Sequence, residues 1–147
     1  MSRLTFGFVE NIAPDDAKVL TDGLLAHADQ AGFTERPHNL AILVRDDTGV
    51  IRAGLMGNTN HRECYINVVW AQDSERAKGL GRKLMGMAEA EATRRGCRVI
   101  NLFSMSYGAP GFYAKLGYSE LGRVEGLGDQ HNLTRFWLGK KLAEQSS

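Results

Sequence analysis

The residues with the clearest chemical potential form a short, basic, glycine-rich segment at residues 76–81. This segment lies between a strand-like run, residues 64–71, and a run with helical periodicity, residues 80–95. The first four N–H groups of a helix lack intrahelical partners and lie at the positive end of its dipole, so they can bind a phosphate. We therefore predict that a pyrophosphate binds at Arg76, Ala77, Lys78, Gly79, Leu80, Gly81 and Arg82.

The side chains of this segment support the same prediction. Gly79 and Gly81 carry no Cβ, which lets the backbone approach a ligand closely. Arg76 and Lys78 place two cations beside the same few amides. A P-loop nucleotidase is excluded, because the Gly-Lys-Ser/Thr arrangement of that motif does not occur here.

A second motif, Gly-Phe-Tyr-Ala-Lys-Leu-Gly-Tyr at residues 111–118, follows another strand-like run at residues 98–104. The order of strand, glycine segment, helix, strand and this motif resembles the GNAT superfamily of N-acetyltransferases. The resemblance covers about residues 40 to 140. It implies that the glycine segment binds the pyrophosphate of acetyl-CoA, which is a co-substrate, and that no metal is needed.

The resemblance also implies where the rest of acetyl-CoA lies. In this family the strands before the glycine segment and after its helix splay apart, and the pantetheine arm occupies the gap. We expect Val69, Trp70 and Ala71 to offer backbone groups to the pantetheine amides, although Trp70 is equally suited to core packing. Ser106 stands where many members have an asparagine that contacts pantetheine, and serine has a shorter reach.

The resemblance places Tyr113 close to the sulfur of the cofactor. A phenol with a pKa near ~10 is protonated at neutral pH, so Tyr113 could donate a proton to the leaving thiolate. The alternative is that Tyr113 packs beside Phe112 in the core. An acceptor amine with a pKa near ~10.4 must first lose a proton. Glu63 is a candidate base acting through water, although an acid at a strand end is more often solvated, and Asn67 could order such a water.

The expected activity is direct transfer of an acetyl group to a small amine or a protein amino group. Cys64 could carry the acetyl group, but the sequence shows no base beside it. The competing hypothesis is a non-catalytic acyl-CoA-binding or interaction module with the same fold. A homodimer is left open, and the acceptor is not specified.

Composition limits these possibilities. The length of 147 residues predicts one domain, residues 1–147, with a frayed tail at residues 141–147. The net charge of the chain is +1. The balanced charge favours neither nucleic acid nor a membrane surface, and no apolar run approaches the ~18 residues of a membrane span. The two cysteines lack metal-type spacing and the N-terminus does not resemble a signal peptide, so we expect a cytoplasmic protein.

The periodicity of the chain predicts an α+β fold. A helix beginning at Pro14 and ending before Gly32, and the helix that follows the glycine segment, should flank a mixed, mostly antiparallel sheet with a splayed central strand pair. In the second helix Glu91 falls within the apolar stripe, so either the last turns lift away from the core or its carboxylate finds a polar partner. Besides the two strands above, strands are expected at residues 4–9, 40–44, 50–55, 118–124 and 133–138, with a turn at residues 57–60.

Overall fold

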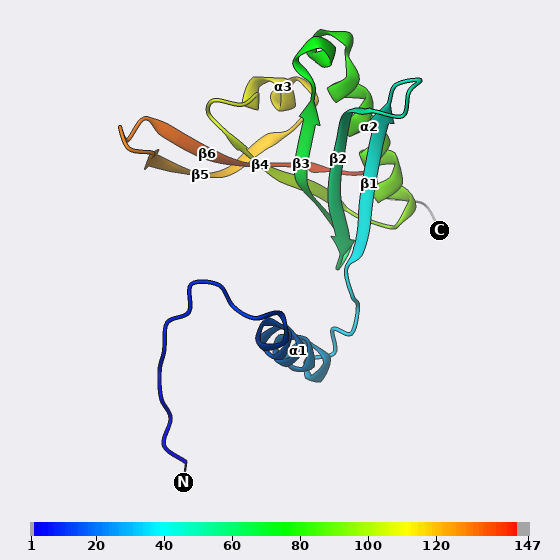
Figure 1. Ribbon diagram of the computed structural model, residues 1–147. Helices are drawn as coiled ribbons and strands as arrows, with labels where there is room; N and C mark the ends of the chain where they lie inside the picture. The colour runs from blue at the N-terminus through cyan, green and yellow to red at the C-terminus, as the bar shows by residue number, and fades with distance from the viewer. Residues whose placement is uncertain (1, 144–147) are drawn as a thin grey trace. The chain divides into compact units, whose positions relative to one another are not determined.

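The computed structural model describes residues 2–143, except for the side chains of Arg76 and Ala77. The chain divides into two compact units, residues 1–35 and residues 36–147 (Figure 1). Within the described residues, no helix is both long enough and apolar enough to cross a membrane.

The first unit contains one helix, α1 (Pro14–Gln30). Pro14 occupies the first turn, where its missing N–H costs nothing, and Asp15 and Asp16 favour the positive end of the dipole. The helix confirms the sequence-based prediction, but none of its side chains is buried. The strand expected at residues 4–9 is wrong, because these residues form neither helix nor strand and are exposed.

The second unit is built on a six-stranded sheet with the order β1-β2-β3-β4-β6-β5. Neighbouring strands are antiparallel except β3 and β4, which are parallel. The bounds are β1 (His38–Arg45), β2 (Ile51–Asn60), β3 (Glu63–Ala71), β4 (Val99–Met105), β5 (Ser119–Leu127) and β6 (Leu133–Lys141). This arrangement confirms the predicted mixed, mostly antiparallel sheet.

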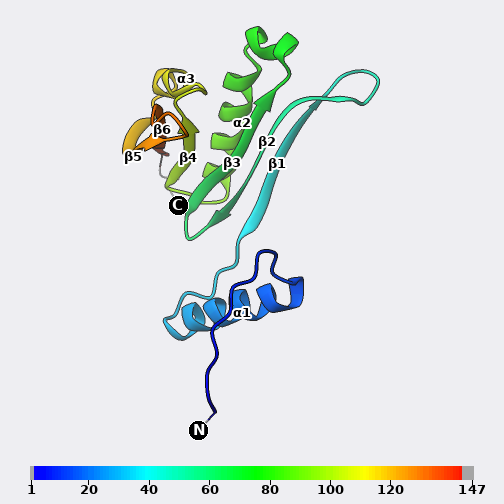
Figure 2. The ribbon, with the colours of Figure 1, turned by 60° about the vertical axis from the view of Figure 1, so that its left-hand side comes forward.

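Three helical segments accompany this sheet: η1 (Asp73–Lys78), a 3-10 helix, α2 (Leu80–Arg94) and α3 (Pro110–Lys115). Helix α2 lies behind β1, β2 and β3 in Figure 1, and Figure 2 shows it from the side against that one face of the sheet. Its buried side chains are Leu84, Met85, Ala88 and Ala92. Burial of Leu84 and Met85 contributes roughly 1.5–3 kcal/mol each to folding.

Glu91 in this helix has the polar partners that its place in the apolar stripe requires. Its carboxylate accepts hydrogen bonds from Arg94 and Arg95, and the Arg95 guanidinium also donates to the carbonyl of Asn39 in β1 at 3.1 Å. The hydrogen bonds from Arg94 and Arg95 lower the pKa of Glu91 to about 2. The carboxylate therefore helps to tie the end of α2 to the edge of the sheet.

The turn expected at residues 57–60 is wrong, because β2 continues to Asn60. The chain reverses at His61 and Arg62, whose φ angles of 50° and 61° are both in the left-handed region that a two-residue hairpin turn requires. Gly57 instead marks a register shift with β3, where a Cβ would lie 2.2 Å from the carbonyl oxygen of Tyr65. Glycine is therefore needed here for close backbone approach.

The first two residues of the predicted frayed tail belong to the fold. Lys141 is the last residue of β6, and Leu142 packs against the core and donates its backbone N–H to Arg98 at 2.8 Å. Residues 144–147 of that predicted tail lie outside the described residues.

Candidate active site

A cavity opens where β3 and β4 cease to pair. The parallel ladder runs only from the Glu63–Val99 pair to the Ile66–Leu102 pair, and both strands then continue without pairing to each other. A cavity of about 620 Å³ lies between their remaining residues. Because the inner edge of β3 has no strand partner over residues 67–71, its backbone groups can pair with a ligand.

Tyr113 of α3 lines this cavity and is 8% exposed. Its ring makes edge contacts with Phe112 at 5.1 Å and Tyr118 at 5.8 Å between ring centroids. Burial raises the pKa of the Tyr113 phenol, so the group is protonated at neutral pH and can donate. Within the described residues its hydroxyl has no hydrogen-bond partner, which leaves that donor available to a ligand in the cavity.

The end of the second sequence motif fixes α3 in place. The Tyr118 hydroxyl donates to the Glu89 carboxylate of α2 at 2.9 Å, and Lys140 of β6 donates to the other Glu89 oxygen at 2.8 Å. Burial and the neighbouring Glu89 raise the pKa of Tyr118, so this phenol stays a donor. Gly117, with φ at +96°, makes the turn that places Tyr118 there. The motif thus contains one tyrosine that lines the cavity and another that anchors its helix.

The predicted pyrophosphate segment forms η1 and the first turn of α2. Gly79 is the residue before α2 and has φ 74° and ψ 17°, a left-handed conformation that favours glycine. No side chain caps the start of α2, and its first turn contains no acidic residue. The first amides of α2 are therefore not satisfied by a side-chain cap and not opposed by a negative charge, as an anion site requires.

Gly81 also allows two helices to pack closely. A Cβ built at Gly81 would lie 3.1 Å from the ring of Phe112, so this glycine lets α3 pack closely against α2. A Cβ at Gly79 would meet nothing within 4 Å, so that glycine is required by backbone conformation alone. The two glycines therefore support the segment for separate reasons.

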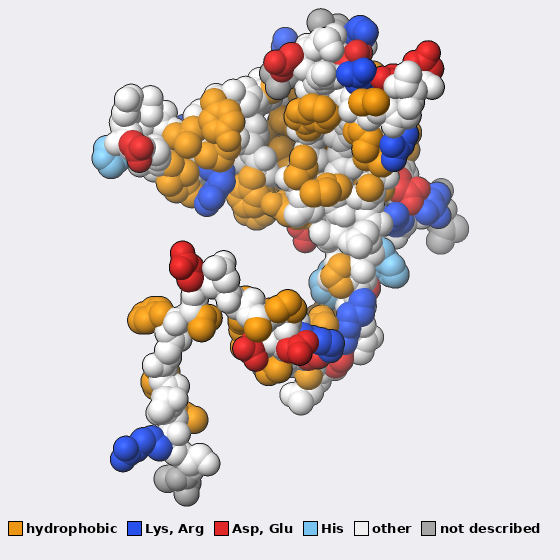
Figure 3. Space-filling model, in the orientation of Figure 1, with side chains coloured by type: hydrophobic (Ala, Val, Ile, Leu, Met, Phe, Trp, Pro, Cys, Tyr) orange, Lys and Arg blue, Asp and Glu red, His pale blue; other side chains and the backbone are white. Residues whose placement is uncertain are grey.

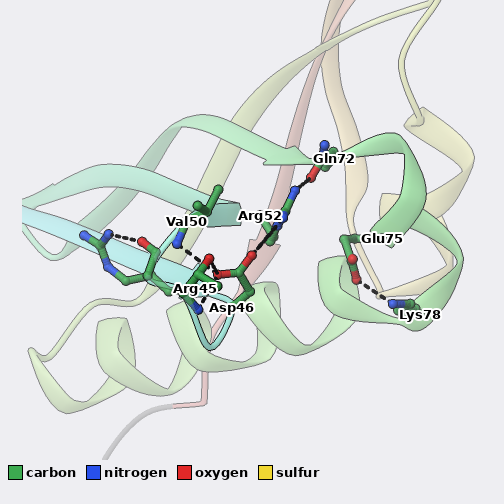
Figure 4. A network of polar contacts seen from close by, with 9 residues as sticks. Arg45, Asp46, Val50, Arg52, Gln72, Glu75 and Lys78 are labelled. Carbon is green, nitrogen blue, oxygen red and sulfur yellow. Dashed lines mark hydrogen bonds and ion pairs between the residues drawn. The ribbon is translucent and has the colours of Figure 1, made fainter.

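The cations of the segment differ in their surroundings. Lys78 is exposed and pairs with Glu75 at 2.9 Å, three residues earlier in η1 (Figure 4). Arg82 is exposed in the first turn of α2. The side chains of Arg76 and Ala77 lie outside the part of the structure that is described.

A polar network fixes Gln72, the residue directly before η1. Arg52 of β2 donates to the Gln72 side chain at 2.7 Å, and the Gln72 backbone N–H donates to the Arg52 carbonyl at 2.8 Å (Figure 4). Arg52 also donates to Asp46 at 2.8 Å, and Asp46 accepts from the amides of Thr48 and Val50. Hydrogen bonding, from the Thr48 hydroxyl foremost, lowers the pKa of Asp46. The β1–β2 turn is thereby connected to the start of η1.

The strand residues predicted to contact the pantetheine all line the cavity. They are Val69, Trp70 and Ala71. Trp70 is 46% exposed, which does not fit the alternative that it only fills the core. Asn67 lines the same cavity.

Ser106 is not among the residues that line the cavity, although the sequence pointed to it. Its hydroxyl oxygen accepts the backbone N–H of Thr134 at 3.0 Å, which holds the end of β4 to β6. Ser104, two residues earlier, is buried and lines the cavity instead. A polar residue at the end of the apolar run of β4 was the sequence signal that could have identified it.

Glu63 lies outside the cavity, three residues before Ile66, or about 10 Å along the strand. The buried amide of Asn101 donates to its carboxylate at 2.7 Å. The structure thus does not bring Glu63 and Tyr113 together. No acidic or histidine side chain lines the cavity among the described residues, and none of those residues forms a metal-type cluster.

Comparison with known proteins identifies the family. The model of the acetyltransferase (GNAT) family matches residues 8–118. An acetyltransferase from Agrobacterium fabrum is 30% identical over 126 residues, covering 85% of this chain and 90% of that protein. Blasticidin-S acetyltransferase from Streptomyces morookaense is 32% identical over 73 residues, covering 49% of this chain and 54% of that protein.

A solved structure supports the same assignment. The crystal structure of a protein from Agrobacterium tumefaciens described as an acetyltransferase is 26% identical, with a TM-score of 0.86, and covers 95% of this chain and all of that one. Enzymes of the GNAT family use acetyl-CoA as the acetyl donor. The chain therefore belongs to the GNAT family of acetyltransferases, as the order of its two motifs indicated.

Proposed function

We propose that this protein transfers an acetyl group from acetyl-CoA directly to the nitrogen of a primary amine, with Tyr113 as the group that protonates the leaving sulfur. The observation that carries this proposal is the cavity between the unpaired ends of β3 and β4, with the Tyr113 side chain in its wall. The Tyr113 side chain is 8% exposed and lines this cavity, so its phenol can contact a reacting atom there.

The proposed position of acetyl-CoA follows from the start of α2 and the unpaired edge of β3. The pyrophosphate binds the uncapped amides at the start of α2, with Lys78 and Arg82 nearby in sequence. The pantetheine arm runs along the unpaired edge of β3, where residues 69–71 can exchange backbone hydrogen bonds with its amides. A backbone N–H of that edge can also polarise the thioester carbonyl.

The proposed reaction needs one bond formed and one broken. The lone pair of the neutral amine attacks the thioester carbonyl carbon, and the carbon–sulfur bond then breaks with its electron pair going to sulfur. The Tyr113 phenol gives its proton to that thiolate, and the proton released by the amine returns to the phenol through water. The products are the N-acetylated amine and free CoA.

Cys64 does not fit an acetyl-enzyme intermediate. Its side chain is 0% exposed, and burial raises its pKa to about 12, so neither access nor a thiolate is provided at neutral pH. Cys64 and Cys97 are buried and are not joined in a disulfide, which suits a reducing compartment, and we propose the cytoplasm as the site of the reaction.

We propose a small-molecule amine as the acceptor, with a protein amino group as the second candidate. The support is the relative from Streptomyces morookaense, which is a blasticidin-S acetyltransferase, and whose likeness covers 49% of this chain. Because the cavity wall contains no acidic or histidine side chain among the described residues, deprotonation of the amine is assigned to water, with Asn67 able to orient it.

Release of free thiol from acetyl-CoA tests this proposal. Purified protein is incubated with acetyl-CoA and a panel of amino-nucleoside antibiotics, aminoglycosides, polyamines and peptide N-termini. Amine-dependent thiol release with the acetylated product found by mass spectrometry supports the transfer. Binding of acetyl-CoA by calorimetry, with background thiol release across the whole panel, would instead favour the acyl-CoA-binding module.

A further inference from the structure

The face of the sheet opposite α2, called the bare face, is apolar and has no helix over it in the second unit. Six of its exposed large side chains come from five strands: Leu43, Met56, Val68, Trp70, Phe103 and Trp137. The strands β1, β2 and β3 form an open hollow of about 200 Å³ on this side. Figure 3 views this face and shows apolar side chains gathered over β2 and β3 and over β5 and β6. A surface of this kind marks an interface.

The first unit carries an apolar surface of its own. Helix α1 buries no side chain, and Leu20 and Leu24, which share one helical face, are 66% and 70% exposed. In the segment before it, Phe6 is 97% exposed and alternates with other apolar residues as in a strand with one buried face. These side chains are unexplained by the fold of a single unit.

We propose that the first unit of one copy covers the bare sheet face of a second copy, and the reverse, in a symmetric exchanged dimer. Charge favours this pairing. Residues 1–35 contain two basic and six acidic side chains, a net charge of −4, whereas residues 36–147 contain 16 and 11, a net charge of +5. Arg135 lies over the ring of Phe103 at 5.5 Å, which places a cation on the bare face.

The segment that connects the units favours contact with a second copy over contact within the same chain. Residues 33–37 form no helix, strand or turn, and Pro37 directly precedes β1. A residue that precedes proline is restricted to extended conformations, so Arg36 disfavours a reversal at this point. A short hinge that resists turning back promotes exchange between copies, and two-fold symmetry covers both apolar surfaces at once.

The proposed dimer contact also lies beside the candidate active site. Val68 and Trp70 line both the hollow on the bare face and the cavity between β3 and β4. A helix docked on that face therefore borders the cavity from the side of the sheet away from α2. Because the oligomeric state is measured independently of activity, a monomer would contradict the dimer and leave the proposed acetyl transfer unaffected.

The native mass and one matched pair of variants form the first test. The full chain has a mass of 16.2 kDa, so analytical ultracentrifugation should find twice that mass at micromolar concentration. Leu24→Asp should raise the dimer dissociation constant by about tenfold or more, because it places a charge in the proposed contact. Ala26→Asp adds the same charge on the opposite face of α1 and should leave that constant unchanged.

Cross-linking distinguishes a contact between two copies from a contact within one chain. Leu24→Cys protein, isotopically labelled, is mixed with unlabelled Met56→Cys protein and treated with a short bismaleimide. The native Cys64 and Cys97 are buried and give little background. A product of two chains joined through these two positions supports the exchange. A mass of one chain at all concentrations, a dimer that Leu24→Asp does not weaken, or cross-linking of the Leu24→Cys/Met56→Cys double variant only within one chain would overturn it.

Discussion

The substitution Tyr113→Phe separates a catalytic phenol from a packing one. It removes only the hydroxyl of a residue that lines the cavity, and this hydroxyl has no hydrogen-bond partner among the described residues. The free energy of unfolding should therefore change by no more than about 0.5 kcal/mol. If the hydroxyl donates to the leaving thiolate, the lost charge-assisted hydrogen bond is worth about 1.5–3 kcal/mol in the transition state, or about 10- to 150-fold in kcat.

The chain offers a matched control in Tyr118→Phe. That hydroxyl donates to Glu89, and Tyr118 does not line the cavity, so its loss should lower stability by about 1–3 kcal/mol. Because Tyr118 anchors α3 without contacting the cavity, the loss of kcat should be smaller than in Tyr113→Phe. Each kcal/mol should lower the melting temperature by about 2–4 °C in a chain of this length. Kinetics use thiol release at saturating acetyl-CoA, and stability uses urea unfolding.

The pattern across the two variants decides the role of Tyr113. A loss of kcat in Tyr113→Phe with unchanged stability, and a loss of stability with a smaller loss of kcat in Tyr118→Phe, fits a proton donor at Tyr113. If Tyr113→Phe keeps the wild-type kcat at saturating acetyl-CoA, Tyr113 does not protonate the sulfur, and the proposed mechanism is wrong at that step.

Three further substitutions and one control test the structure around the site. Gly79→Ala should cost about 1–2 kcal/mol of stability because of its positive φ and should weaken acetyl-CoA binding, whereas Gly86→Ala, in the open interior of α2, should stabilise by about 0.5–1 kcal/mol; urea unfolding and calorimetry compare them. Arg52→Ala should weaken acetyl-CoA binding, measured by calorimetry, because Gln72 loses its partner at the start of η1; wild-type affinity would contradict this role. The ion pairs of Glu91 with Arg94 and Arg95 lower its pKa, so they stabilise the fold above about pH 4.5, and this contribution is lost as pH falls towards about 2. In urea unfolding, the stability difference between wild type and Glu91→Gln should therefore shrink over that range. A constant difference would argue against the ion pairs.

Local patterns predicted most of the elements in this fold. Pro14 and its neighbouring acids marked the start of α1, and the apolar spacing from Leu80 marked α2. Glu91 was recognised as a residue that needs a partner, and Arg94 and Arg95 provide it. These predictions succeed because caps, periodicity and buried charge depend on neighbours within one or two helical turns.

The failures concern partners that are distant in sequence. Alternation at residues 4–9 showed which side chains would share a face, but not whether another strand was available to pair with them. The turn residues 57–60 were assigned from composition, whereas Gly57 serves the close approach of Tyr65 in the next strand. Glu63 and Ser106 were placed in the site by position along the chain, and their actual partners, Asn101 and Thr134, come from other strands.

The short ladder between β3 and β4 has a mechanical consequence. Only four residue pairs join the sheet half made of β1, β2 and β3 to the half made of β4, β6 and β5. The two halves are therefore joined by strand pairing at one end only, and Tyr113 lines the cavity at the other end. A long ligand that hydrogen-bonds along that cavity acts as a missing seventh strand, and it should slow hydrogen exchange at amides far from its own atoms by stiffening the whole sheet.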